Sequence, residues 1–281
     1  MTGRSSRRPR GASRKELSGH LPAGRLRRPA VRPPLVIPID GPSGAGKSSA
    51  SRLLAERLGW RVFETGGLYR AVAWSALQAG VDPDDRPAVG RLCARLSLTL
   101  VPVAHIYGSK GGRTGPAGWR IRVGARTLTR ELRGDAVTAM ASRVAALPVV
   151  RRRLLGLQRA LVREGRVVME GRDIGTVVCP SAPAKFFLDA DPSVRGRRRF
   201  HEQAAGRGTA PRGSARMVLS AITERDRRDE GRRIAPLRAA PDAVRIDTTG
   251  LTLEQVVDKM MTVLNGRGIP LSFERLRRGG H

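Results

Sequence analysis

The sequence has few cysteines, few histidines and no long hydrophobic run. It contains two cysteines and four histidines in 281 residues. Cys93 and Cys179 lie far apart in sequence and fit no metal-binding spacing, so a disulfide framework is not expected and packing is the favoured role of Cys179. No apolar run approaches the roughly 18–20 residues that cross a bilayer. We therefore expect a soluble protein of the reducing cytoplasm, without a membrane partner.

Lysine is also scarce, although the chain is strongly basic. The 53 basic and 24 acidic residues give a formal net charge of +29, yet the lysines number five, at positions 15, 47, 110, 185 and 259. Such a charge is typical of proteins that bind nucleic acid or anionic membranes. Because a coding bias can also favour arginine, the charge indicates an anionic partner without identifying it. The phosphates of a small nucleotide meet this requirement.

The two ends of the chain are predicted to lie outside the fold. Residues 1–34 carry ten Arg or Lys and one acidic residue, Glu16, with no hydrophobic periodicity. This composition predicts a disordered extension, and a nucleic-acid-binding arm is the alternative. The segment lacks the apolar centre of a secretory signal, although its arginine content loosely resembles a transit peptide. Residues 269–281 are expected to form a frayed tail.

From Leu35 onward, short apolar strands alternate with amphipathic helices. This pattern predicts an α/β domain at 35–268, with a parallel sheet covered on both faces. Strands are predicted at 35–39, 60–63, 97–101, 119–123, 166–170, 185–189 and 243–247. One helix is predicted after the glycine-rich loop and ends at Gly59, and another begins at Thr65 and ends at Gly80. Further helices are predicted at 134–146, 149–164, 192–205 and 214–230, and a last helix begins at Thr252. Thr65 and Thr252 are the candidate helix caps, and Pro38 indicates an irregular or unpaired position in the first strand.

The glycine-rich stretch after the first strand matches G-x-x-x-x-G-K-[ST] in full. Its glycines let the backbone wrap an anion, and the amino end of the following helix adds a partial positive charge. Lys47 is predicted to reach the β- and γ-phosphates, and the Ser48 hydroxyl to hold Mg²⁺, with Asp40 or Glu170 as candidates for further contacts through water. The residues predicted to bind ATP are Gly41, Pro42, Ser43, Gly44, Ala45, Gly46, Lys47, Ser48 and Ser49.

This loop indicates a nucleoside triphosphate and leaves its use open among a small-molecule kinase, a regulatory GTPase and a nucleic-acid-dependent ATPase. A GTPase needs a D-x-x-G soon after the loop and an N-K-x-D. The D-x-x-G of this chain is Asp247–Gly250, near its end, where it reads as a strand-end turn, and the chain has no N-K-x-D. A helicase-like ATPase would normally be longer, although the basic charge keeps that alternative open.

A second set of residues could fix a phosphorylated acceptor, whose oxygens repel those of the donor and must be held by cations. Arg172 and Asp173 follow a buried strand, at the end where α/β sheets bind ligands. Arg225, Asp229 and Arg232 occur at i, i+4 and i+7, which predicts one helical face. Each group alone is also consistent with an ordinary ion pair. The full candidate set is Thr65, Arg70, Ser142, Arg151, Arg172, Asp173, Arg225, Asp229 and Arg232.

Seven segments, taken together and in order, resemble the bacterial cytidylate kinases: IDGPSGAGK, TGGLYRAVA, SRVAALPVVR, GRDIGTVV, ERDRRD, APL and IDTTGL. These nucleoside monophosphate kinases transfer a phosphoryl group from ATP to CMP or dCMP. The resemblance, over about residues 35–265, implies a P-loop NTPase core, an acceptor-binding insertion and a short lid at about 195–225. The insertion would be the β-patterned, glycine-rich segment at about 97–135 together with neighbouring helices. The resemblance also implies a monomer that uses ATP and Mg²⁺ and needs no nucleic acid.

The resemblance also implies that the nine candidates line the acceptor site. Asp173 can accept from the exocyclic amino group of cytosine, and Arg151 can donate to the base carbonyl and ring nitrogen. Asp229 suits a ribose hydroxyl. Planar guanidinium groups suit the phosphate, because each can meet two oxygens: Arg70, Arg172 and Arg232.

No catalytic base is expected, because a phosphate monoester with a second pKa near 6 is already mostly dianionic at neutral pH. Catalysis would then depend on positioning and on neutralising charge. The residues predicted for this role are Lys47, Arg172, Arg225 and Arg228, with Arg197, Arg198 and Arg199 as further lid candidates.

The chain departs from the family pattern at four places. Glu64 and Glu170 stand where Asp is usual, and Ser48-Ser49 stand where Gly-Thr is common. Gly231 replaces the usual Asn before Arg232. The alternative activities are a kinase of the same fold acting on AMP, UMP or a shikimate-like alcohol, and a basic nucleic-acid-binding ATPase.

Overall fold

The computed structural model describes residues 35–104, 116–207 and 214–271 of the 281-residue chain. The predicted N-terminal extension therefore lies outside the described residues. So do positions 105–115 of the glycine-rich loop, positions 208–213 of the predicted lid, and the last ten residues of the predicted tail.

A mainly parallel sheet forms the centre of the domain. Its strands are β1 (Val36–Asp40), β2 (Arg61–Glu64), β3 (Leu98–Val103), β4 (Gly118–Val123), β5 (Arg126–Leu128), β6 (Val167–Glu170), β7 (Phe186–Asp189) and β8 (Val244–Asp247). They lie in the order β3-β4-β2-β6-β1-β7-β8, and β5 pairs with β4. β1 pairs in parallel with β6 and β7, which confirms the predicted α/β architecture. Pro38 pairs with Met169 inside this central strand, and the pairing of β1 with β7 begins one residue later, at Ile39.

Eight α-helices surround the sheet within the described ranges. They are α1 (Lys47–Leu58), α2 (Gly66–Gln78), α3 (Arg86–Arg95), α4 (Asp135–Val144), α5 (Pro148–Glu164), α6 (Pro192–Arg207), α7 (Ala215–Glu230) and α8 (Leu253–Gly266). A short 3₁₀ helix, η1 (Glu131–Arg133), precedes α4, and a π-helix, η2 (Ile174–Val178), follows β6. The sequence patterns predicted these α-helices except α3, and they did not predict η2.

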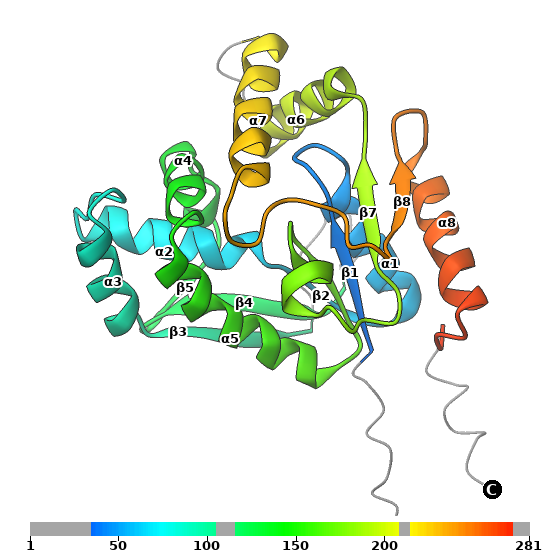
Figure 1. The fold of residues 1–281 in the computed structure, drawn as a ribbon, viewed down its shortest axis with the longest axis horizontal. Coiled ribbons are helices and arrows are strands. Elements are labelled where there is room, and N and C mark those ends of the chain that lie inside the picture. The colour runs from blue at the N-terminus through cyan, green and yellow to red at the C-terminus, as the bar shows by residue number, and fades with distance from the viewer. Residues whose placement is uncertain (1–34, 105–115, 208–213, 272–281) are drawn as a thin grey trace, which may run out of the picture. The chain divides into compact units, whose positions relative to one another are not determined.

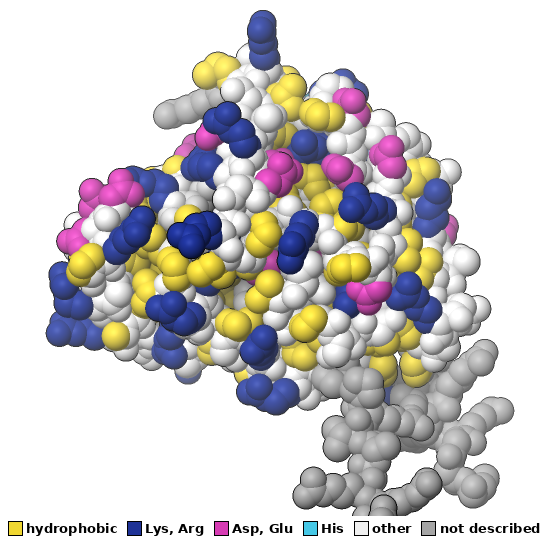
Figure 2. Space-filling view, viewed as in Figure 1, with side chains coloured by type: hydrophobic (Ala, Val, Ile, Leu, Met, Phe, Trp, Pro, Cys, Tyr) yellow, Lys and Arg dark blue, Asp and Glu magenta, His cyan; other side chains and the backbone are white. Residues whose placement is uncertain are grey.

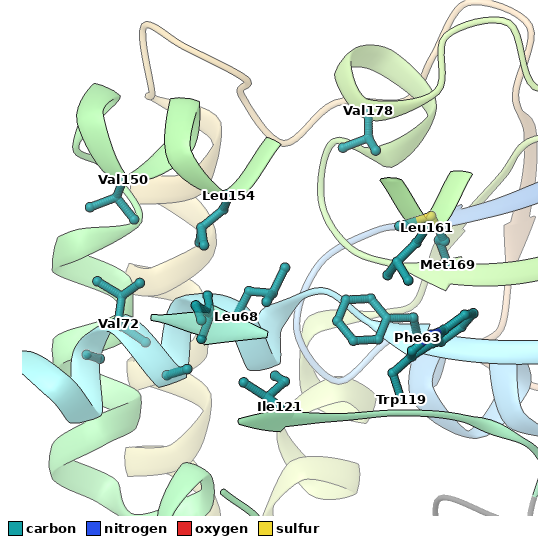
Figure 3. Packing of buried hydrophobic residues seen from close by; sticks show 14 of the residues in the cluster. Phe63, Leu68, Val72, Trp119, Ile121, Val150, Leu154, Leu161, Met169 and Val178 are labelled. Atoms are coloured by element: carbon teal, nitrogen blue, oxygen red, sulfur yellow. The ribbon is translucent and has the colours of Figure 1, made fainter. Parts of the chain in front are cut away.

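The strands bury side chains on both faces of the sheet, because consecutive residues of a strand point to opposite sides. In β1, Ile37 and Ile39 pack with α1 and α8, whereas Val36 belongs to a second cluster that includes α2, α4 and α5. Figure 3 shows part of this second cluster. There the Phe63 and Trp119 rings meet edge to face, with their centres 6.1 Å apart. The site described below therefore rests on strands that are buried on both sides.

The segment 97–135 continues the sheet at its edge. β3 pairs antiparallel with β4, and β4 pairs antiparallel with β5, while a parallel contact between Val62 and Gly118 joins this antiparallel part to β2. Trp119, Ile121 and Leu128 contribute to the cluster shared with α2 and α4. These strands thus pack as part of the same core.

The helices α6 and α7 cover most of the segment that the sequence predicts as a lid, and they are here called the lid helices after that prediction. They lie beyond the carboxyl ends of β1 and β7 (Figure 1). They pack closely, since a Cβ atom on Gly196 of α6 would lie 3.0 Å from Leu219 Cβ of α7. Figure 2, drawn from the same side as Figure 1, shows basic side chains spread over the surface, with hydrophobic side chains between them. None of the helices in the described ranges combines the length and apolar character needed to span a bilayer.

Candidate active site

The glycine-rich loop, residues 41–48, joins β1 to α1 and is here called the phosphate loop. Gly41, Gly44 and Gly46 adopt positive φ values of 143°, 77° and 84°. A Cβ atom on Gly41 would lie 1.9 Å from the Leu188 carbonyl oxygen, so no other residue fits there. No side chain caps the amino end of α1. Its first N–H groups therefore suit an anion.

Lys47 lies at the start of α1 with 4% of its surface exposed. Its Nζ donates to the Pro42 carbonyl oxygen at 2.6 Å and lies 4.0 Å from Glu170 Oε1. Burial, reinforced by the positive charge of Arg172 and only partly offset by Glu170, lowers the pKa of Lys47 to about 7. A bound anion would favour the charged ammonium group and reverse this shift.

The Ser48 hydroxyl donates to Glu170 Oε2 at 2.7 Å. A hydroxyl and a carboxylate side by side next to the phosphate loop fit the oxygen ligands that Mg²⁺ prefers. Asp40, the other sequence candidate, is placed differently. Its two carboxylate oxygens accept the main-chain N–H groups of Ile174 and Gly175 at 2.9 and 2.8 Å, and burial raises its pKa to about 7. The described geometry therefore favours Glu170.

A cavity of about 140 Å³ opens beside the phosphate loop. All nine acceptor candidates line it: Thr65, Arg70, Ser142, Arg151, Arg172, Asp173, Arg225, Asp229 and Arg232. The phosphate loop contributes Ser43, Gly44, Gly46, Lys47 and Ser48 to the lining, whereas Gly41, Pro42, Ala45 and Ser49 do not line the cavity. None of the described residues of 97–135 lines the cavity, because α2, α4 and α5 form that side.

Asp173 and Arg151 form a buried ion pair in the cavity wall. Arg151 Nη1 donates to Asp173 Oδ2 at 2.9 Å, and Arg151 Nε donates to the Ala145 carbonyl oxygen at 2.8 Å. The Arg151 guanidinium also lies 5.5 Å from the centre of the Tyr69 ring. Burial raises the pKa of Asp173 although Arg151 works in the opposite direction. These contacts hold both polar groups in fixed orientations.

Asp229 orients two arginines of the cavity lining. Its Oδ2 accepts from Arg172 Nε at 3.1 Å, and its Oδ1 accepts from Arg232 Nη2. Burial acts against ionisation, yet the positive charges of Arg172, Arg232 and Arg225 hold the pKa of Asp229 below its usual value. Arg172 Nη1 also donates to the Gly41 carbonyl oxygen at 2.7 Å. Arg172 thus connects the acceptor candidates directly to the phosphate loop.

Two polar atoms in the cavity wall are buried without a partner. Arg225 Nε and Ser142 Oγ have no hydrogen-bond partner among the described residues. Burial, together with the nearby charge of Arg172, lowers the pKa of Arg225 to about 10. Since an unpaired buried polar group is costly, both positions favour a ligand that supplies acceptors or donors.

Three sequence interpretations need correction or qualification. The Thr65 hydroxyl does not cap α2, since it donates to the Glu170 carbonyl oxygen at 2.8 Å. Arg232 is not on the face of α7, because that helix ends at Glu230, and it reaches the cavity from the segment beyond. Arg228 lies outside the cavity, where its exposed side chain donates to the Glu224 carbonyl oxygen at 3.3 Å.

Sequence reasoning did not single out several lining residues. The Tyr69 ring lies close to the Arg151 guanidinium, and the position of Tyr69 directly before Arg70 was the available signal. Glu202 of α6 pairs with Arg199 at 3.0 Å, and both line the cavity. Arg197 and Arg198 do not line it: Arg197 donates to Ser193 Oγ at 3.4 Å, and Arg198 donates to Thr248.

A parallel sheet with a phosphate loop at its carboxyl edge, facing a cavity rich in arginine, defines a P-loop phosphotransferase. Residues 37–266 match the family model described as cytidylate kinase. The cytidylate kinase of Mycobacterium avium is 44% identical over 234 residues, covering 83% of this chain and 96% of that protein. Those of Geobacter sulfurreducens and Geobacillus thermodenitrificans are both 43% identical, over 85% and 83% of this chain and 96% and 97% of theirs. The chain belongs to the cytidylate kinase family.

Proposed function

We propose that this enzyme transfers the γ-phosphoryl group of ATP to CMP or dCMP, releasing ADP with CDP or dCDP. The observation that carries the proposal is the position of Arg172. Its guanidinium group contacts the Gly41 carbonyl oxygen of the phosphate loop and Asp229 of the cavity wall. One planar cation at this junction can meet oxygens of both the donor and the acceptor phosphates.

The donor would be held by main-chain amides of the phosphate loop and by Lys47. Mg²⁺ bound near Ser48 and Glu170 would supply charge neutralisation on the donor phosphates. Arg225, whose buried Nε lacks a partner among the described residues, is placed to stabilise charge on the group in transfer.

The acceptor would lie in the cavity with its base toward the Asp173–Arg151 pair. Asp173 accepts from the exocyclic amino group that cytosine has and uracil lacks, and Arg151 donates to the base carbonyl and ring nitrogen. Arg70, Arg172 and Arg232 bind the phosphate. Asp229 is near the ribose and also holds two of these arginines in place.

No group in the site is required to remove a proton, because the acceptor phosphate arrives mostly dianionic at neutral pH. The contribution of the protein is to line up two phosphates that repel each other and to neutralise charge as the phosphoryl group moves. The lid would comprise about residues 195–225, which in the described ranges belong to α6 and α7. We further propose that the enzyme acts as a monomer in the cytoplasm.

The test is a comparison of acceptors. ADP release would be measured in the presence of MgATP with CMP, dCMP, UMP, AMP, GMP and shikimate at matched concentrations. We expect kcat/KM to be highest for CMP or dCMP and much lower for the others. Rapid turnover with AMP but not with CMP would refute the cytidine assignment while leaving the kinase class intact. A control without acceptor measures any ATPase activity.

A further inference from the structure

A buried ion pair joins the two lid helices behind the cavity. Arg195 of α6 and Asp226 of α7 are 8% and 4% exposed, and Arg195 Nη1 donates to Asp226 Oδ2. Neither residue lines the cavity. A direct role in binding the substrates is therefore not indicated, and the burial of two opposite charges needs another explanation.

The same pair hydrogen-bonds to both main-chain groups of Ser43, at the tip of the phosphate loop. The Ser43 N–H donates to Asp226 Oδ1 at 3.0 Å, and the Ser43 carbonyl oxygen accepts from Arg195 Nη1 at 3.1 Å. Arg195 Nε donates in addition to the Ala190 carbonyl oxygen at 3.2 Å, just after β7. One guanidinium group and one carboxylate thus fix the loop tip to both lid helices and to the edge of the sheet.

Close packing leaves these groups little room to shift. A Cβ atom on Gly44 would lie 2.6 Å from the Arg195 carbonyl oxygen and 2.9 Å from Arg195 Cβ. The backbone of α6 therefore touches the phosphate loop directly. The loop tip and α6 cannot slide past each other without first losing the contacts to Ser43.

Two cationic side chains that do line the cavity lie close to the pair on the same helices. Arg199 follows Arg195 by about one helical turn on α6, and Arg225 directly precedes Asp226 on α7. A buried ion pair contributes little net stability compared with apolar residues of the same size, because desolvation offsets the attraction. Its geometry, with fixed hydrogen bonds in several directions, is better suited to defining one arrangement of loop and helices.

We propose that Arg195 and Asp226 are positioning residues for the phosphoryl donor. They hold the tip of the phosphate loop against the lid helices, and so place the loop amides in a set relation to Arg199 and Arg225. This inference rests on the proposed kinase function. Loss of the pair should therefore impair the use of ATP more than the binding of CMP, whose proposed base contacts, Asp173 and Arg151, come from elements other than the lid helices.

The main variant replaces both members with apolar residues, Arg195→Met together with Asp226→Leu. A single replacement by an apolar residue would leave a buried charge without its partner and could unfold the protein. Asp226→Asn is the second variant, because its side-chain oxygen can still accept from the Ser43 N–H while the ion pair is lost. The matched control is Glu224→Gln with Arg227→Gln, which removes the surface ion pairs of Glu224 with Arg227 and Arg228 from the same helix α7.

Thermal unfolding establishes that each variant is folded, and calorimetry gives the Kd values of MgATP and of CMP separately. For the double variant we expect kcat/KM for ATP to fall about tenfold or more and the Kd of MgATP to rise, as two hydrogen bonds to the loop are lost. The Kd of CMP should stay within about twofold. Asp226→Asn should show a smaller loss that again affects ATP more than CMP. The control should match the wild type.

A folded double variant with wild-type ATP kinetics and affinity would overturn the proposal and leave the pair a packing feature. Equal losses for ATP and CMP would also overturn it, since they would indicate a general defect of the fold. If the double variant does not fold, the ATP and CMP constants of Asp226→Asn decide in the same way. Failure of the proposed function is recognised separately, because the wild type would then show no CMP-dependent ADP release while MgATP affinity remains measurable.

Discussion

The lowered pKa of Lys47 predicts that MgATP binding takes up a proton. Burial and the neighbouring charge of Arg172 lower this pKa to about 7 in the empty site. The phosphates of bound ATP would hold the ammonium group charged. At pH 7.5 about a quarter of Lys47 is protonated before binding, so uptake should be about 0.75 proton. Uptake should fall to about 0.1 proton at pH 6 and approach about one at pH 8.5.

The sign of the linked effects follows from the same shift. Because the pKa is lower in the free protein than in the complex, ATP affinity should decrease as pH rises above about 7. In the empty protein the pKa of Lys47 lies below its unfolded-state value of 10.5. The contribution of Lys47 to the stability of the fold is therefore fully present above pH 10.5. It is lost progressively as pH falls toward 7. Nucleotide binding offsets this loss.

The assay is titration calorimetry of MgATP without an acceptor, at pH 6, 7.5 and 8.5. At each pH the measured enthalpy is plotted against the ionisation enthalpy of several buffers, and the slope gives the number of protons taken up. Saturating Mg²⁺ and a parallel titration of Lys47→Met account for protons that belong to the nucleotide. Equal uptake by wild type and variant, or no change with pH, would show that Lys47 is already charged in the empty site and would refute the reasoning.

Five substitutions test single features of the site and fold. Lys47→Met should lower kcat by a factor on the order of 10² to 10³ or more in steady-state assays, and near-normal turnover would contradict its role. Asp173→Asn should reduce kcat/KM for CMP more than for UMP; equal losses would remove Asp173 from base recognition. Arg225→Ala should lower kcat by about 10² or more while Arg228→Ala stays within about twofold, and the reverse order would contradict their placement. Thr252→Ala should cost about 1 kcal/mol in urea unfolding with kcat unchanged.

Much of the fold could be predicted from local patterns because burial imposes its period on the sequence. Every predicted strand and most α-helices begin and end within a few residues of the predicted limits, whereas the short strand β5 was not predicted. The helix cap predicted at Thr252 is confirmed, and the Gln255 side chain completes a capping box with it. The helix α3 was missed because it buries little, with Val89 and Cys93 as its buried residues. The Asp85 side chain, which accepts from the Ala88 N–H at 2.9 Å, was the available start signal.

The parts of the site that depend on distant contacts could not be predicted in the same way. The motif ERDRRD names three arginines, but the rotation of α7 decides that Arg225 faces the cavity and Arg228 faces solvent. Helical periodicity also failed for Arg232, because the helix ends before it and the following segment turns back to the cavity. The Ser43 contacts with Arg195 and Asp226 join positions more than a hundred residues apart, so no local pattern carries them.

The charge of the site explains how so many arginines can face one small cavity without substrate. Seven cationic and five acidic side chains line it, so carboxylates such as Asp229 and Glu170 hold most of the cations in position before any nucleotide arrives. This compensation is incomplete, because Arg225 Nε has no partner among the described residues and its pKa is lowered to about 10. Phosphate oxygens can supply the missing acceptors, and they do so where the donor and acceptor must meet. The residual positive charge therefore favours two bound nucleotides over either one alone, since each brings anionic groups to a site that the protein itself leaves partly unneutralised.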